Sequence, residues 1–167
     1  MRDVLPTAIG VALLPPIWAV VSASFGITFG WVSLACAGMY FVIGDPVKSG
    51  MKTSVSFLIG CLWGLGATLA INGLPISKDI SLFAVLCVLG FLAVICSEIV
   101  IKKRTVLSAW LGSWAIALGV LSQAEPNQFG IIFIKLIIAM LIGVWYIGLF
   151  NQNFQKFLKQ IMKRKKS

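Results

Sequence analysis

The sequence contains no histidine and few charged residues, and both deficits restrict what the chain can do. Of its 167 residues, 11% are charged and 59% are hydrophobic. Soluble globular domains carry roughly one charged residue in four. The composition therefore places the chain among membrane proteins. A spanning helix needs about 20 apolar residues, so six such stretches leave only short connections and exclude a soluble catalytic domain.

The missing residue types also exclude most catalytic and metal chemistry. Without histidine or a second buried carboxylate, no nucleophile–base pair can be assembled, so we expect no enzyme activity. The cysteines lie in separate apolar runs without a Cys-x-x-Cys pair, which predicts neither a metal site nor a disulfide framework. We interpret them as small packing residues and expect no metal and no cofactor. They are Cys36, Cys61, Cys87 and Cys96.

Six long apolar segments are present, separated by turn-type residues. They predict an all-α fold: a polytopic membrane bundle of six transmembrane helices in residues 1–152, followed by a short basic amphipathic helix in the tail, residues 153–167. The separators include "DPVKSG" at 45–50, "NGLPISKD" at 72–79 and "QAEPNQ" at 123–128. The segments are Pro6–Ala23, Gly26–Gly44, Thr53–Ile71, Asp79–Ser97, Thr105–Ser122 and Gln128–Phe150.

The distribution of Lys and Arg predicts the orientation, because cytoplasmic loops carry the excess of basic residues. With both termini inside, the inner side holds twelve basic residues and the outer side only Lys78. We therefore expect a multi-pass protein of the bacterial cytoplasmic membrane with both termini in the cytoplasm. An alternative concerns "MRDVLPTAIGVALLPPIWAVVSAS", whose apolar core and small-residue end also fit a cleaved signal peptide. Cleavage would leave five helices.

The tail "NFQKFLKQIMKRKKS" has the pattern of a helix lying on a membrane surface. At about 100° per residue, its aromatic and aliphatic side chains share one face and its lysines share the opposite one. Anionic lipid of the inner leaflet is the expected partner, and a nucleic acid is not. The candidate lipid-binding residues are Lys156, Lys159, Lys163, Arg164, Lys165 and Lys166.

Small residues recur along one face of three segments. Lipid supplies no hydrophobic drive for helix association, so close approach at small faces is expected to hold the bundle together. The stripes are Ser56, Gly60, Gly64 and Ala67 in the third segment, Ser108, Gly112, Ala115, Gly119 and Ser122 in the fifth, and Gly26, Gly30, Ala37 and Gly44 in the second. Any solute path must then be narrow or lie between protomers.

Two features near the middle of the predicted spans are candidates for a path. Trp63 and Trp114 place indole N–H groups at a depth where each needs a partner, although packing alone also explains them. Pro15 and Pro16 remove backbone N–H groups from the first segment and are expected to bend or break it. Broken helices at the midplane recur in transporter binding sites, and prolines are also common in ordinary membrane helices.

Lys135 is the single charge within "QFGIIFIKLIIAMLIGVWYIG", residues 128–148. A lysine at the bilayer centre costs about 2.5–3.5 kcal/mol on insertion scales. It shares a small, polar helix face with Gln128 and Tyr146, which predicts that it points into the bundle. Asp79 and Glu125 are possible counter-ions. A structural ion pair and a solute or anion path remain alternatives for Lys135.

The runs "PPIWAVVSASFG", "GWVSLACAGMYF", "SGMKTSVSFLIGCLWG" and "LSAWLGSWAIALG" carry a family resemblance. In their aromatic and glycine positions, including Trp18, Trp31 and Trp63, the chain resembles the YcdZ-like family of small bacterial inner-membrane proteins of unknown function. The resemblance implies a cytoplasmic-membrane protein with six spans and leaves its activity open.

We therefore expect a channel or simple transporter for a small neutral or anionic solute, because a lone lysine does not suit a cation path. Its candidate path residues are Lys135, Trp63, Trp114, Pro15, Pro16 and Tyr146. The alternative is a structural or accessory membrane subunit that presents its small-residue faces to a partner. A homo-oligomer fits both hypotheses. The short strings "CLWGLG" and "VWYIGL" also resemble each other, which by itself is weak evidence for internal duplication.

Overall fold

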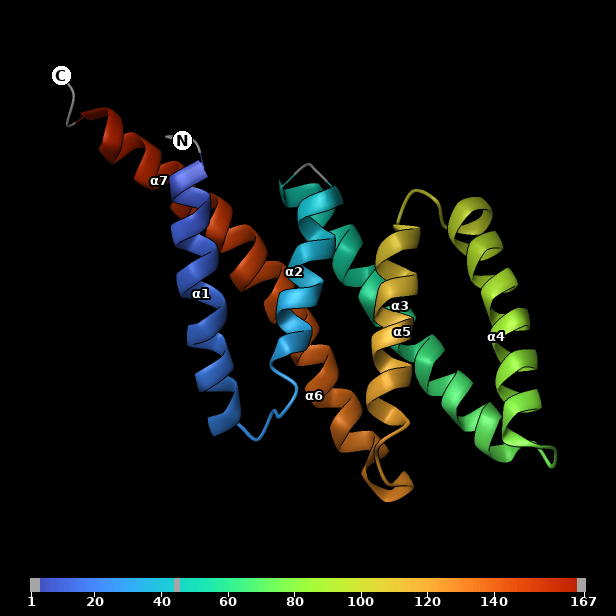
Figure 1. The fold of residues 1–167 in the computed structure, drawn as a ribbon. Coiled ribbons are helices and arrows are strands. Elements are labelled where there is room, and N and C mark those ends of the chain that lie inside the picture. Colours follow the sequence, from blue (N-terminus) through green and yellow to red (C-terminus); the bar gives the residue numbers. More distant parts are fainter. Residues whose placement is uncertain (1–3, 44–45, 165–167) are drawn as a thin grey trace. The chain divides into compact units, whose positions relative to one another are not determined.

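The computed structural model describes residues 4–43 and 46–164, and within them the chain is helical without β-strands. The all-α prediction is thus confirmed (Figure 1). The elements are α1 (Val4–Ser24), α2 (Trp31–Ile43), α3 (Pro46–Gly73), α4 (Lys78–Ile95) with its π-helical end η1 (Cys96–Val100), α5 (Leu107–Leu121), the short 3₁₀ turn η2 (Pro126–Gln128), α6 (Phe129–Ile142), the π-helical η3 (Gly143–Phe150) and α7 (Asn151–Arg164).

Three of the helices are long and apolar enough to cross a membrane. They cover Gly50–Gly73, Lys78–Val100 and Pro126–Leu158. Three more apolar helices are shorter and cover Ala8–Ser24, Trp31–Val42 and Leu107–Leu121. At about 1.5 Å per residue, the 13 residues of α2 reach about 20 Å, less than the roughly 30 Å hydrocarbon core. The three long helices therefore indicate a membrane protein.

Two predicted helix starts were wrong. The second helix begins at Trp31 rather than Gly26, because Gly26 adopts a φ of 66° and turns the chain out of α1. The third helix begins at Pro46 rather than Thr53, so most of the predicted "DPVKSG" turn is helical. Proline suits the first helical position, where its missing N–H has no intrahelical partner.

The predicted break at Pro15 and Pro16 is absent. Both prolines lie inside α1, which continues without interruption from Val4 to Ser24. Each proline removes one backbone N–H from the helical ladder, and the surrounding turns keep their helical geometry. The two prolines therefore lie within a continuous helix rather than at a helix interruption.

The chain divides into two compact units, each of which is described by itself. Unit 1 comprises Met1–Gly50 and Ala139–Ser167, and unit 2 comprises Met51–Ile138. Unit 1 thus contains α1, α2, η3 and α7, and unit 2 contains most of α3, all of α4 and α5, and the first part of α6.

In unit 2, α3 and α5 pack in parallel through glycine. A Cβ at Gly60 would overlap the carbonyl oxygen of Trp110 and the Ser113 side chain, and a Cβ at Gly64 would overlap Ala117. Ser56 accepts a hydrogen bond at its Oγ from the Val106 N–H, at 2.8 Å. The predicted small stripe of α3 is fully buried, which confirms that prediction.

The small stripe of α5 does not make this contact, contrary to the prediction. Ser108, Ala115, Gly119 and Ser122 are exposed. The buried face of α5 is instead formed by Ala109, Trp110, Ser113, Trp114, Ala117 and Leu121. The large indoles fit there because α3 contributes only glycine and small side chains opposite the α5 backbone. The side chains of Trp110 and Trp114 therefore lie along the flanks of α3 and do not pack between the two helices.

In unit 1, α2 packs on η3 in the same parallel manner. A Cβ at Gly143 would overlap the Ser33 carbonyl oxygen and Cys36, and a Cβ at Gly148 would overlap the Tyr40 ring. The two glycines are five residues apart, which would place them on different faces of an α-helix. The π-helical turn of η3 has a repeat of i→i+5, so it brings both glycines to the face that contacts α2.

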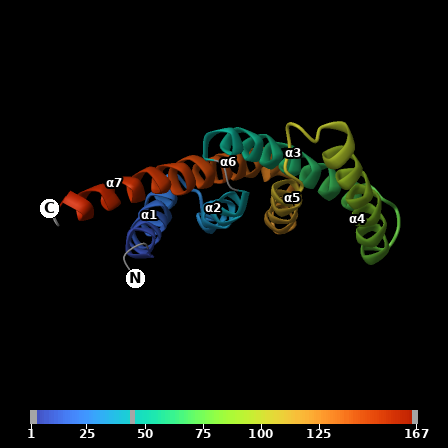
Figure 2. The same ribbon diagram turned by 90° about the horizontal axis from the view of Figure 1, so that it is seen from above.

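Unit 1 is completed by α1 and α7, which lie side by side (Figures 1 and 2). The Asn151 side chain is fully buried and occupies the space over Gly10, where a Cβ would overlap its amide oxygen. The first turn of α7, which begins two residues before the predicted tail, is therefore part of a packed unit. Cys36 and Cys61 are buried, whereas Cys87 is exposed, so the packing interpretation does not extend to Cys87.

Gly60 provides a direct test of the α3–α5 contact. We expect Gly60→Ala to lower the free energy of unfolding by about 1–3 kcal/mol, because the new methyl group has no space between the helices. Gly66→Ala on the same helix is the matched control, since a Cβ there has nothing within 4 Å. Thermal unfolding of both variants in detergent measures the difference. Equal stability of the two variants would contradict the packing.

Candidate functional site

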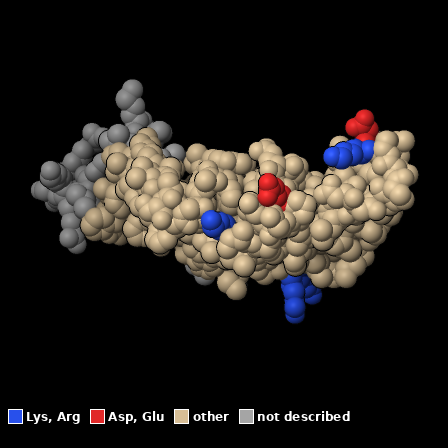
Figure 3. Space-filling model, turned by 90° about the horizontal axis from the view of Figure 1, so that it is seen from below, with Lys and Arg blue, Asp and Glu red and all other residues tan. Residues whose placement is uncertain are grey.

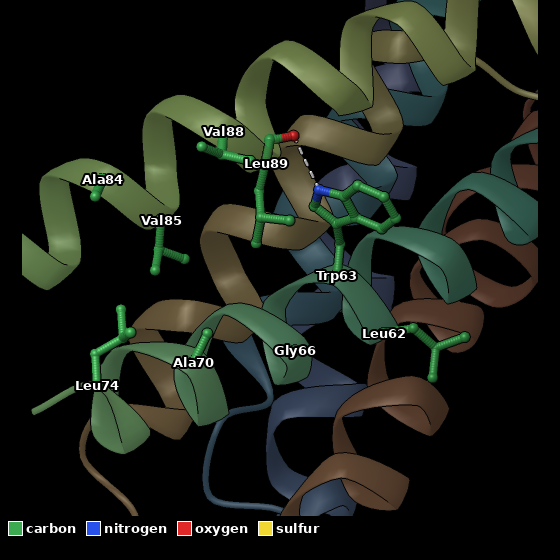
Figure 4. Close-up of a pocket in the computed structure, with 9 residues that line it drawn as sticks. All are labelled: Leu62, Trp63, Gly66, Ala70, Leu74, Ala84, Val85, Val88 and Leu89. Atoms are coloured by element: carbon green, nitrogen blue, oxygen red, sulfur yellow. Dashed lines mark hydrogen bonds between the residues drawn. The ribbon is translucent and has the colours of Figure 1, made fainter.

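Three tryptophans form the centre of unit 2. The Trp63 indole Nε1 donates a hydrogen bond to the carbonyl oxygen of Leu89 on α4, at 3.0 Å (Figure 4). The rings of Trp63 and Trp110 meet edge to face, with centroids 5.3 Å apart and an interplanar angle of 81°. Trp63 is thus fixed by one hydrogen bond and one aromatic contact.

Trp114 belongs to the same region. It is 7% exposed and forms a buried cluster with Ala67 and Val85, against which Trp63 is packed. On the α4 side its ring lies 3.9 Å from the position of a Cβ at Gly90. The structure therefore brings together Trp63 and Trp114, two of the residues that the sequence predicted for a path.

Trp110 and Trp114 share a further property. Neither indole nitrogen has a hydrogen-bond partner among the described residues, although both side chains are buried. A buried polar group without a partner costs about 1–3 kcal/mol. The two residues are four apart on α5 and so lie on one helix face. An indole N–H donates only, so the face carries two unpartnered donors.

A cavity lies beside this tryptophan cluster, also within unit 2. We call it the polar bowl; it has a volume of about 610 Å³. Its lining comes from the end of α3, the start of α4, the end of α5 and the start of α6. The lining residues are Thr68, Ile71, Asn72, Lys78, Asp79, Leu82, Leu118, Gly119, Leu121, Ser122, Ala124, Pro126 and Phe129.

The polar bowl and the tryptophan cluster share two residues. Ile71 and Leu118 line the bowl, and both also pack against the cluster that contains Trp114. The bowl therefore borders the cluster at these two apolar side chains.

One face of the molecule, drawn in Figure 3, shows few charged side chains on a largely uncharged surface, and in one place Lys or Arg atoms lie beside Asp or Glu atoms.

A groove of about 510 Å³ lies between α3 and α4 (Figure 4). Apart from Trp63, its lining consists of glycine and aliphatic side chains: Leu62, Gly66, Ala70, Leu74, Ala84, Val85, Val88 and Leu89. The Trp63 N–H is already donated to Leu89. The side chains of the groove thus offer no free hydrogen-bonding group, which suits lipid contact better than solute binding.

Lys135 lies on α6 within unit 2 and is partly buried, next to the fully buried Leu136. Its two predicted counter-ions, Asp79 and Glu125, are exposed. Lys135 does not line the polar bowl. An exposed ion pair joins Glu98 and Lys102, with Lys102 Nζ 3.7 Å from Glu98 Oε2.

The other predicted path residues belong to unit 1. Pro15 and Pro16 lie in α1, and Tyr146 lies in η3. Tyr146 is partly buried and stacks on Phe150, with ring centroids 5.9 Å apart. The structure thus groups Trp63, Trp114 and Lys135 in unit 2 and assigns the remaining three residues to the other unit.

The candidate lipid-binding residues follow α7. Lys156 is exposed, and Lys159, Lys163 and Arg164 continue the same helix. Lys165 and Lys166 lie outside the described residues. The aromatic side chains of Phe150 and Phe154 stack with centroids 6.5 Å apart at the start of this helix.

The sequence interpretation missed Trp110 and the polar bowl. Trp110 is four residues from Trp114, so the helical repeat alone would have placed both on one face. Asn72, Lys78 and Asp79 all lie in the "NGLPISKD" segment, which was interpreted only as a turn. Nothing local in that segment indicates that four helix ends meet there.

A comparison with known proteins identifies a family for this chain. A family model described as "Protein of unknown function (DUF1097)" matches residues 8–156. No curated protein and no solved structure matches the chain. Because the family model spans nearly all of the described helices, the chain belongs to the DUF1097 family of proteins of unknown function.

Proposed function

We propose that the protein is a channel or simple transporter for a small neutral or anionic solute, with its path through unit 2. One observation carries the proposal: Trp110 and Trp114 hold buried indole N–H groups without partners, one helical turn apart, in an apolar unit. Protein interiors leave few buried donors unsatisfied, and those that remain call for an explanation. A solute or water passing along this face of α5 supplies one.

The hydrogen-bonding chemistry of the two indole donors restricts the class of solute. Indole N–H groups bind oxygen acceptors and anions and offer nothing to a bare cation. Lys135 adds a positive charge to the same unit, which further disfavours cations. A solute with a carbonyl, hydroxyl or anionic group therefore fits this path, and the proposal assigns the protein no catalytic activity.

The path begins at the polar bowl. From there, Ile71 and Leu118 lead to Trp114, and Trp110 follows about 6 Å further along α5. Trp63 stands edge-on to Trp110 and closes the α3 side. The narrowness of the path follows from the α3–α5 contact, at which Gly60 and Gly64 meet the α5 backbone and only small side chains, those of Ser113 and Ala117.

Loss of the unpartnered donors tests this proposal. We expect Trp110→Phe and Trp114→Phe each to reduce solute flux about tenfold or more, the change that corresponds to one lost hydrogen bond of about 1.4 kcal/mol. Folding stability should change little through hydrogen bonding, since neither N–H bonds to the protein. The assay is the osmotic light-scattering response of proteoliposomes to small neutral solutes and small organic anions.

Trp31→Phe is the control for this assay, because Trp31 is 58% exposed and lies outside unit 2. If no solute in the panel moves faster than in empty liposomes, or if the Trp110 and Trp114 variants match Trp31→Phe, the path is refuted.

A second candidate is an accessory membrane subunit without transport activity of its own. The exposed small residues of α5 favour it: Ser108, Ala115, Gly119 and Ser122 form a face that permits close helix contact with a partner or a second copy. Lys135→Met separates the candidates. A path residue loses flux while the protein accumulates normally, whereas a structural residue loses the protein.

The same proposal includes six membrane-spanning helices, a bacterial cytoplasmic membrane and both termini in the cytoplasm, as in the YcdZ-like family that the sequence resembles. The excess of basic residues on one side of the six segments supports this orientation. The short helices α2 and α5 can span where the bilayer thins locally or where other helices cover their ends.

Cysteine labelling tests the orientation. In a cysteine-free background, an impermeant maleimide added to spheroplasts should label Lys78→Cys, which belongs to the outer loop, and should not label Lys102→Cys, which belongs to the inner one. Both native side chains are exposed, so the protein itself does not hide either position from the maleimide. The reverse pattern would invert the assigned topology.

Anionic lipid is the proposed partner of α7. Each basic residue near an anionic surface contributes about 1 kcal/mol. We expect phosphatidylglycerol to raise the thermal unfolding midpoint in nanodiscs, and we expect a smaller rise for a variant with Lys156, Lys159 and Lys163 changed to Gln. High salt should remove the difference by screening. An equal rise in both proteins would contradict the assignment.

A further inference from the structure

The polar bowl is lined by two side chains of opposite charge, Lys78 and Asp79. Lys78 and Asp79 open α4, and both line the bowl. Among the described residues neither forms an ion pair, and Ser77, at the N-cap, makes no side-chain cap bond. Asp79 is favourable at a helix N-terminus, but Lys78 at the first position is not, because a cation opposes the helix dipole. Helix stability therefore accounts for Asp79 and leaves Lys78 unexplained.

The helix ends around the bowl also carry both signs. The lining includes residues from the carboxyl ends of α3 and α5, where backbone carbonyls carry partial negative charge. It also includes residues from the amino ends of α4 and α6, where backbone N–H groups carry partial positive charge. A ligand in the bowl thus meets two negative and two positive helix ends in addition to one lysine and one aspartate.

The remaining lining is apolar. Ile71, Leu82, Leu118, Leu121 and Phe129 face the bowl, and Leu121 is fully buried. Asn72 adds an exposed amide at the rim. The volume of about 610 Å³ lies within the range typical of small-molecule sites, about 300–1,000 Å³. The bowl therefore offers one positive and one negative side chain next to an apolar surface.

We propose that the polar bowl binds a zwitterion, with Asp79 contacting an ammonium group, Lys78 contacting an anionic group and the apolar lining contacting a small aliphatic substituent. This inference rests on the proposed function and narrows its solute, since a zwitterion is neutral overall. The same pair of charges occurs in a free amino acid with an apolar side chain and in a phosphoethanolamine lipid headgroup.

Calorimetric binding to the purified full chain in phosphatidylcholine nanodiscs tests the proposal with four probes. Leucine carries both charges, 4-methylpentanoate only the anionic group, and isoamylamine only the ammonium group. Glycerophosphoethanolamine carries both charges on a lipid headgroup. We expect one of the two zwitterions to bind at least about tenfold more tightly than either single-charge analogue, as follows from one lost charge-assisted hydrogen bond.

Two variants assign the contacts. Lys78→Met should weaken zwitterion binding about 10- to 100-fold and leave isoamylamine unchanged, and Asp79→Asn should weaken zwitterion binding equally and leave 4-methylpentanoate unchanged. Lys102→Met is the matched control, because Lys102 is an exposed lysine of unit 2 distant from the bowl lining. A preference for leucine assigns a free solute, and a preference for glycerophosphoethanolamine assigns a lipid headgroup.

Equal affinity for zwitterions and single-charge analogues overturns the inference, as does an unchanged affinity in both variants. The flux assay is independent of this result. Flux without charge-selective binding refutes the zwitterion site and leaves the proposed function standing. Charge-selective binding without flux supports the site and refutes transport.

Discussion

Both units depend on direct backbone contact between a long helix and a short one. Apolar helices gain nothing by leaving lipid for one another, so packing and hydrogen bonding must hold them together. In unit 2 the backbone of α5 meets α3 at Gly60 and Gly64, and in unit 1 Gly143 of η3 meets the α2 backbone at Ser33 while Gly148 meets the Tyr40 ring. Ser33 adds a hydrogen bond from its Oγ to the Ala139 carbonyl oxygen, at 2.6 Å.

The contact at Gly60 also determines where the indoles go. The carbonyl oxygens of Trp110 and Trp114 face Gly60 and Gly64, so the side chains of these residues extend to the flanks of α3 rather than between the two helices. On those flanks the indoles of Trp110 and Trp114 are buried. Of the three clustered tryptophans, only Trp63 donates to a backbone acceptor, the Leu89 carbonyl oxygen on α4. The unpartnered donors that support a solute path are therefore a consequence of the tight helix contact.

Much of this arrangement follows from the sequence. Low charge and long apolar segments predicted the helical class, and the spacing of Ser56, Gly60, Gly64 and Ala67 predicted the buried face of α3. The corresponding prediction for α5 failed, because its small residues and its tryptophans are both regularly spaced and periodicity does not say which face meets a neighbour. Packing against α3 determines which face of α5 is buried, because large side chains fit only beside the glycines of α3.

Two further features depend on distant parts of the chain. Gly143 and Gly148 have the wrong spacing for one face of an α-helix, and only the π-helical turn aligns them. The polar bowl combines residues from four helix ends, of which the "NGLPISKD" turn supplies two. Local patterns indicate where a turn lies in the chain but carry no information about which other turns lie beside it.

The contact between α2 and η3 has a consequence for synthesis in the membrane. Ser33 and Ala139 are 106 residues apart, and α2 is made long before the helix that covers it. Chains emerge from the N-terminus onward, so α1 and α2 are complete before their packing partners η3 and α7 exist. Unit 2 ends at Ile138. The second segment of the protein to be made thus belongs to the unit whose residues are completed last, and a chain that ends before Ala139 contains all of unit 2 but leaves α2 without its packing partner.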